Sequence, residues 1–170
     1  PDIIQYKLDL GILYRKMGEE DKANGYLKQT LERIRAQKFQ IISASQYLFN
    51  KHEVEHALLG YKLSRDYEKD EHLYALELAE IYRRLNMKQE MVGEYLNFAS
   101  SNPNNINYVK NVLQNLLTEE ADLVSLEELL YGKIQKNPNE TLYSSLLIWV
   151  NLQQQNFYGA FVQARALDKR

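Results

Sequence analysis

The sequence repeats itself at intervals of 34 residues. Apolar residues recur at helical spacing, as Leu10, Leu13, Tyr14 and Met17 do. A period of this length is typical of arrays in which each repeat is a pair of helices, so the chain is predicted to be all-α. Similar residues align at that step in five columns: Leu10, Ala44 and Leu78; Gly11, Ser45 and Ala79; Tyr14, Leu48 and Tyr82; Ala23, Ala57 and Met91; and Leu27, Tyr61 and Tyr95.

Two of the columns hold mainly small residues, which indicates where paired helices cross closely. Gly11 and its equivalents lie in the first helix of each pair, and Ala23 and Ala57 lie in the second. Large residues such as Tyr14 and Tyr61 then fill the space between neighbouring pairs. Because one pair cannot bury its apolar face alone, the pairs are expected to stack.

The period continues into the second half of the chain after one inserted residue. Asn102-Pro103-Asn104 and Asn137-Pro138-Asn139 are alike and lie 35 residues apart (138 − 103), and Asn-Pro is a turn signal. We place the extra residue in the turn at 118–122. The sequence thus predicts a single domain of five repeats, at 4–37, 38–71, 72–105, 106–140 and 141–170. The ten helices are expected at 2–16, 20–36, 38–50, 54–67, 71–85, 88–101, 104–118, 122–136, 139–154 and 157–169.

This pattern resembles the tetratricopeptide repeat family, in its bacterial form. The family's aromatic early in the first helix is replaced by Lys7, Ile41 and Ala75. The resemblance implies a right-handed superhelix (an α-solenoid) whose concave groove, made mostly by the first helices, binds a partner protein or peptide. It is carried by Leu10-Gly11, Tyr14, Gly18, Ala23 and Leu27 in the first repeat, and by Leu78-Ala79, Tyr82, Tyr95 and Pro103 in the third.

The family register assigns particular first-helix positions to the groove. Aromatic anchors, charges and amide side chains together suit an extended peptide. Neighbouring apolar positions (Leu8, Ile12, Ile42 and Leu76) fit the groove and the core equally well. The candidate partner-binding residues are Arg15, Gln46, Phe49, Asn50, Glu80, Arg83, Arg84, Asn111, Asn115, Trp149 and Gln153.

One known use of such domains is not expected here. Members of the family that hold the C-terminal carboxylate of chaperone tails use Lys, Asn and Arg at set positions. Those positions carry Leu8, Ile12, Ser43, Leu73 and Glu77 in this sequence. The carboxylate clamp is therefore missing.

One catalytic pattern occurs, His52-Glu53-Val54-Glu55-His56, which matches the H-E-x-x-H motif of zinc metallopeptidases. That chemistry needs both histidines on one helical face. The repeat register instead puts His52 in a turn and His56 in the first turn of the next helix, which predicts two surface histidines. A zinc metallopeptidase remains only a remote alternative, so no enzyme activity, cofactor or metal is expected.

Composition narrows the remaining classes. The net charge of −2 and the 34-residue step disfavour nucleic acid as a partner, including an RNA-reading helical repeat. The chain has no cysteine and no apolar run long enough for a membrane span, which leaves cytoplasm and periplasm or cell envelope equally open.

The two ends of the sequence favour a second reading. The chain starts at Pro1 and ends within a helical pattern, so we read it as a fragment of a longer protein. Phe157, Phe161 and Ala164 would then face outwards from the last helix. A structural or self-associating segment is accordingly the alternative to a binding scaffold, with homo-oligomers forming through the terminal repeats.

Overall fold

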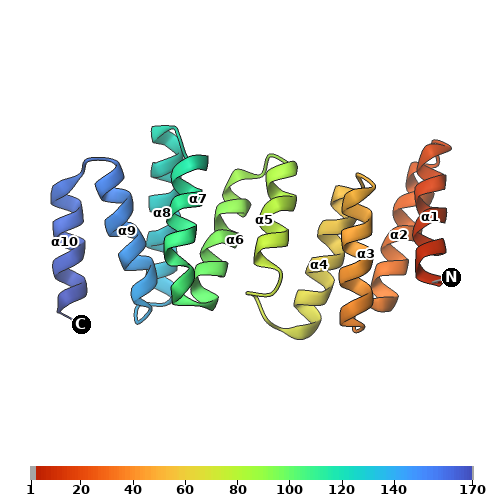
Figure 1. Cartoon of the computed structure of the whole chain (residues 1–170), viewed down its shortest axis with the longest axis horizontal. Helices are drawn as coiled ribbons and strands as arrows, with labels where there is room; N and C mark the ends of the chain where they lie inside the picture. The colour runs from red at the N-terminus through yellow and green to blue at the C-terminus, as the bar shows by residue number, and fades with distance from the viewer. Residues whose placement is uncertain (1–2, 170) are drawn as a thin grey trace. The chain divides into compact units, whose positions relative to one another are not determined.

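The computed structural model describes residues 3–169, and this part of the chain folds into ten α-helices with no strand (Figure 1). The prediction of an all-α chain is confirmed. The helices are α1 (Ile3–Lys16), α2 (Glu20–Ile34), α3 (Lys38–Asn50), α4 (Val54–Glu68), α5 (Ala75–Arg84), α6 (Lys88–Ser101), α7 (Ile106–Leu116), α8 (Glu120–Lys136), α9 (Thr141–Gln153) and α10 (Phe157–Asp168), with a short 3-10 helix, η1, at Pro103–Asn105.

The chain divides into two compact units, Pro1–Met87 (unit 1) and Lys88–Arg170 (unit 2). In unit 1, α1 packs against α2 and α3 against α4, and like helices also meet, α1 with α3 and α2 with α4. The fifth helix of the unit, α5, packs against α4. Buried leucines from successive helices, including Leu8, Leu27 and Leu48, make the core of this unit.

The same turn joins helices at four points along the chain. Its residue after the helix is left-handed: Gly18, His52, Asn86 and Gln155 have φ between 57° and 79°. The next residue donates its N–H to a carbonyl five residues back, at Tyr14, Leu48, Tyr82 and Asn151, over 2.8–3.0 Å. This Schellman geometry satisfies carbonyls at the helix end. The first three turns are 34 residues apart (52 − 18 and 86 − 52), and the fourth follows after 69 (155 − 86).

The turn between α7 and α8 is built differently. Its N-cap residue Glu119 is extended, and Glu119 and Asp122 form a reciprocal capping box at the start of α8. No positive-φ residue occurs between Leu117 and Glu120. The departure falls at the predicted position of the inserted residue, which explains why the 34-residue register shifts there.

Small residues stand where paired helices cross in unit 1. A Cβ atom added to Gly11 of α1 would lie 2.4 Å from Leu27 Cδ2 of α2, and one added to Gly60 of α4 would lie 2.1 Å from Ser45 Oγ of α3. Real Cβ atoms do not approach so closely. The backbones can approach this closely only because these residues are glycines.

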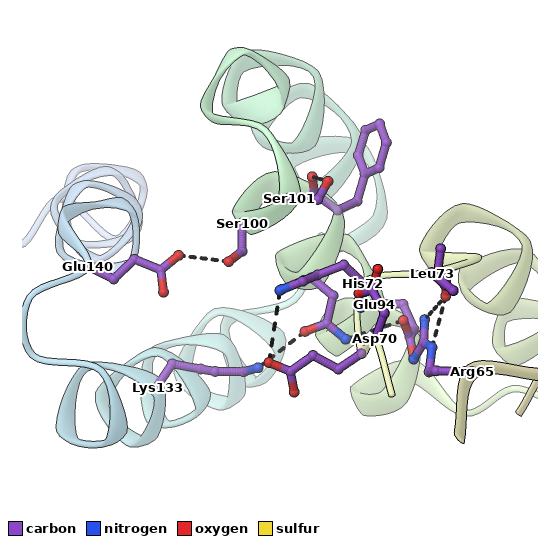
Figure 2. A network of polar contacts seen from close by, with 12 residues as sticks. Arg65, Asp70, His72, Leu73, Glu94, Ser100, Ser101, Lys133 and Glu140 are labelled. Carbon is purple, nitrogen blue, oxygen red and sulfur yellow. Dashed lines mark hydrogen bonds and ion pairs between the residues drawn. The ribbon is translucent and has the colours of Figure 1, made fainter. Parts of the chain in front are cut away.

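In unit 2, α6 packs against α7 and α8, and α9 packs against α8 and α10. Polar contacts add to the apolar core. Ser100 Oγ of α6 donates a hydrogen bond to Glu140 Oε1 ahead of α9 (2.7 Å; Figure 2), and Lys133 Nζ of α8 donates to Asn97 Oδ1 of α6 (3.2 Å). These bonds join elements that are 36 to 40 residues apart in the sequence.

Helix boundaries differ most from the prediction at α5, which begins at Ala75 and not at residue 71. Arg65 Nε of α4 donates a hydrogen bond to Leu73 O (2.8 Å; Figure 2), and Tyr74 is left-handed with φ 60°. A tertiary contact thus holds this stretch in a turn and overrides its helical pattern. Leu73, a predicted groove position, lies in that turn.

Candidate partner-binding cleft

A cleft of about 300 Å³ opens between α3 and α5 of unit 1. Its apolar lining comes from both helices and from α4, while polar side chains stand among them. The lining residues are Gln46, Phe49, Tyr61, Leu76, Glu77, Glu80 and Ile81. Three of the predicted partner-binding residues, Gln46, Phe49 and Glu80, are among them.

Helical spacing explains why these residues meet. Gln46, Phe49 and Asn50 are three and four residues apart, so they share one face of α3. Glu77, Glu80 and Arg84 share a face of α5 for the same reason. The 34-residue period sets Gln46 level with Glu80 in the sequence repeat, and the fold brings these two faces together.

The charged groups at the cleft are held by specific partners. The Arg84 guanidinium lies over the Phe49 ring, 4.7 Å from its centroid, in cation–π geometry. Arg83 Nε and Nη2 donate to the Glu80 carboxylate, both over 2.8 Å. Gln46 Nε2 donates weakly to Asn50 Oδ1 over 3.4 Å. All six predicted residues of α3 and α5 therefore lie in or beside one cleft.

Tyr61 of α4 was not predicted as part of the site. Its side chain is buried, its hydroxyl donates to Gln46 Oε1 (3.4 Å), and its ring lies 5.3 Å from that of Tyr74. Burial raises the pKa of Tyr61 to about 12, with smaller contributions from the nearby Glu77 and Tyr74. The phenol stays neutral and keeps its donor. Its place in a column of large residues indicated packing, and nothing in the period distinguishes packing from lining a cleft.

The other predicted residues lie elsewhere. Asn111 and Asn115 are exposed on α7, where Asn115 Nδ2 donates to Asn111 O over 2.8 Å, so that amide bonds its own helix. Trp149 is half-buried and Gln153 exposed on α9. These four residues belong to unit 2 and do not line the cleft between α3 and α5.

Arg15 does not join the cleft either. Its guanidinium donates to Glu53 Oε1 (2.6 Å) and Asn24 Oδ1 (2.7 Å) and is also paired with Glu20. These groups line a separate cavity of about 650 Å³ between α2 and α4. The contact with Glu53 raises the pKa of Arg15, so the guanidinium remains charged. Its role is to join α1 to the start of α4.

The H-E-x-x-H segment lies beside Arg15. His52 is left-handed in the turn and α4 begins at Val54, so the predicted helix break between the two histidines is confirmed. The prediction of two surface histidines is wrong for His56, which is 8% exposed, because the ring packs against Glu53 with Nδ1 3.2 Å from Oε2. Burial, aided by the charge of Arg15, lowers the pKa of His56 and favours its neutral form.

Two searches of the described structure bear on other kinds of site. Residues 3–169 contain no group of three or more His, Asp or Glu side chains placed to hold a metal ion. None of the helices in this part of the chain combines the length and apolar character needed to cross a bilayer.

A scan against models of protein families and a search of curated proteins both found no match to this chain.

Proposed function

We propose that the chain is a protein-interaction scaffold of the tetratricopeptide kind, which holds an extended peptide segment of a partner protein in the cleft between α3 and α5. The observation that carries the proposal is the convergence of six groove candidates, Gln46, Phe49, Asn50, Glu80, Arg83 and Arg84, on that cleft. Extended peptides bind where main-chain hydrogen-bonding groups adjoin pockets for side chains.

The repeated turn supports the repeat assignment. A left-handed residue followed by the same hydrogen bond recurs at a 34-residue step, and close helix crossings occur at Gly11 and Gly60. Units of this kind stack through neighbour contacts into a superhelix with a concave face. A right-handed superhelix of five hairpins is the architecture we propose for the whole chain.

The composition of the cleft supports peptide binding. Phe49 is half-buried, so part of its ring is already packed while the rest is open to a partner. Aromatic residues in partly desolvated pockets contribute most to interface energies. Exposed amides at Gln46 and Asn50 on one wall offer both donors and acceptors to a peptide backbone.

Peptide display on the immobilised chain tests this proposal. We expect enriched peptides to bind the Phe49→Ala variant at least about tenfold more weakly, because the aromatic anchor is lost. Fluorescence anisotropy with labelled peptides measures the change. The matched control is Phe157→Ala, which removes an exposed phenylalanine of unit 2.

Circular dichroism must first show that both variants are folded. Enriched peptides that bind Phe49→Ala as tightly as the original chain would place their site outside the cleft and contradict the proposal. Failure to enrich any peptide would also count against it.

A second candidate function is self-association, for which the exposed apolar side chains of the terminal helices speak. Phe157, Tyr158 and Phe161 on α10 are 67%, 79% and 56% exposed. An apolar patch of this kind is rare on a monomer surface. Light scattering should then show a mass that rises with concentration and a loss of this rise in Phe161→Asp. A constant monomer mass at all concentrations would eliminate this candidate.

A further inference from the structure

We infer that the cleft between α3 and α5 selects peptides with one basic and one acidic side chain about three residues apart, separated by apolar residues. The inference rests on the proposed function, since it names the partner chemistry of the same cleft. It is drawn from the charges at the two ends of the cleft and from the apolar lining between them.

Glu77 provides the acidic end. It lines the cleft beside Tyr61, is exposed, and forms no salt bridge among the described residues. The other carboxylate of the lining, Glu80, is already neutralised by Arg83 across 2.7 Å. Glu77 is therefore the carboxylate that is available to pair with a basic side chain of a ligand.

Arg84 provides the basic end. It is exposed, it lies over the Phe49 ring, and it too forms no salt bridge within residues 3–169. Its guanidinium keeps its hydrogen-bond donors available, because a cation–π contact uses the face of the group and not its N–H bonds. A carboxylate of the ligand can accept two of these donors.

The helix fixes the distance between the two charges. Glu77 and Arg84 are seven residues apart on one face of α5, which corresponds to about 10 Å along the axis. An extended peptide advances about 3.3 Å per residue, so three residues cover the same distance. Charges at positions i and i+3 of the ligand would reach both groups.

The lining between the charges is apolar. Leu76, Ile81, Phe49 and Tyr61 lie there, in a volume of about 300 Å³. This space suits one or two aliphatic side chains from the residues between the charged positions. Either direction of the peptide chain is compatible, since the amides of Gln46 and Asn50 can both donate and accept.

Four synthetic peptides test the inference by fluorescence anisotropy. They share a Gly/Ser frame and differ in a central tetrapeptide: Lys-Leu-Val-Glu, Leu-Lys-Glu-Val, Lys-Leu-Val-Lys and Glu-Leu-Val-Glu. The first two have the same composition and net charge, so they differ only in the spacing of the charges. We expect the first to bind the original chain at least about fivefold more tightly than each of the others.

Charge reversal should switch the preference. In Glu77→Lys both ends of the cleft are basic, and Glu-Leu-Val-Glu should become the best ligand; in Arg84→Glu both ends are acidic, and Lys-Leu-Val-Lys should. The ratio of the two relevant Kd values is expected to change about tenfold, and less at high salt. Glu32→Lys, a reversal at an exposed site on α2, is the matched control and should leave the preference unchanged.

The outcomes separate this inference from the proposed function. If all four peptides bind equally, or if the variants keep the original preference, the charge selection is overturned, while display peptides that depend on Phe49 still support the scaffold. If neither these peptides nor displayed ones bind in a Phe49-dependent way, both proposals fail.

Discussion

Replacing Gly11 with leucine is expected to lower the free energy of unfolding by about 1–3 kcal/mol, the usual cost of forcing a larger side chain into a packed core. A Cβ atom alone would lie 2.4 Å from Leu27 Cδ2 and 2.6 Å from Leu27 Cγ. Leu27 is fully buried, so it cannot swing away into solvent. The crossing of α1 and α2 has to open. Chemical denaturation followed by circular dichroism at 222 nm measures the loss.

Gly25 supplies the matched control for this substitution. It lies on the exposed face of α2, and a Cβ atom added there meets nothing within 4 Å. Gly25→Leu should therefore stabilise the helix by several tenths of a kcal/mol, because leucine has the higher helix propensity. Equal effects of the two substitutions would mean that Gly11 does not lie at a close crossing.

Replacing Arg15 with methionine is expected to cost about 2 kcal/mol of unfolding free energy. The side chain of its partner Glu53 is only 7% exposed, so removing Arg15 leaves a buried carboxylate with a neutral His56 beside it. Fully buried pairs lose about 3–5 kcal/mol when one partner is removed. The cost is smaller here because the Arg15 side chain is 30% exposed and solvent screens the pair.

Lys28→Met is the matched control for the loss of Arg15. Lys28 forms an exposed pair with Glu32 at 3.9 Å, and such pairs contribute at most about 0.5 kcal/mol. Both variants remove one positive charge from unit 1, so a general effect of net charge would appear in both. A loss for Arg15→Met no larger than that for Lys28→Met would show that the Glu53 carboxylate needs no buried cation.

Most helix positions could be predicted from the sequence because the 34-residue period determines them. The predicted bounds of α3 and α6 agree with the structure at both ends. The start of α5 could not be predicted in this way, because it depends on a hydrogen bond from Arg65 to the backbone of Leu73, which no periodic pattern encodes.

The cleft was only partly predictable, for a related reason. Arg15, Phe49 and Arg83 occupy one column of the repeat (49 − 15 and 83 − 49 are both 34), and the structure uses them in three ways. Arg15 pairs with buried Glu53, Phe49 lines the cleft, and Arg83 pairs with Glu80 on its own helix. The period fixes where a backbone position lies, whereas long side chains choose among partners that come from distant parts of the sequence.

The irregular turn between α7 and α8 has a consequence for how unit 2 loses its structure. The closest helix packing of α7 is with α6, whereas α8 is held by both α6 and α9. In arrays where each element contacts only its neighbours, melting starts at the element with the fewest neighbours and need not involve the rest. The one-residue insertion would then make α7 the helix that detaches first, so that unit 2 loses its structure in steps.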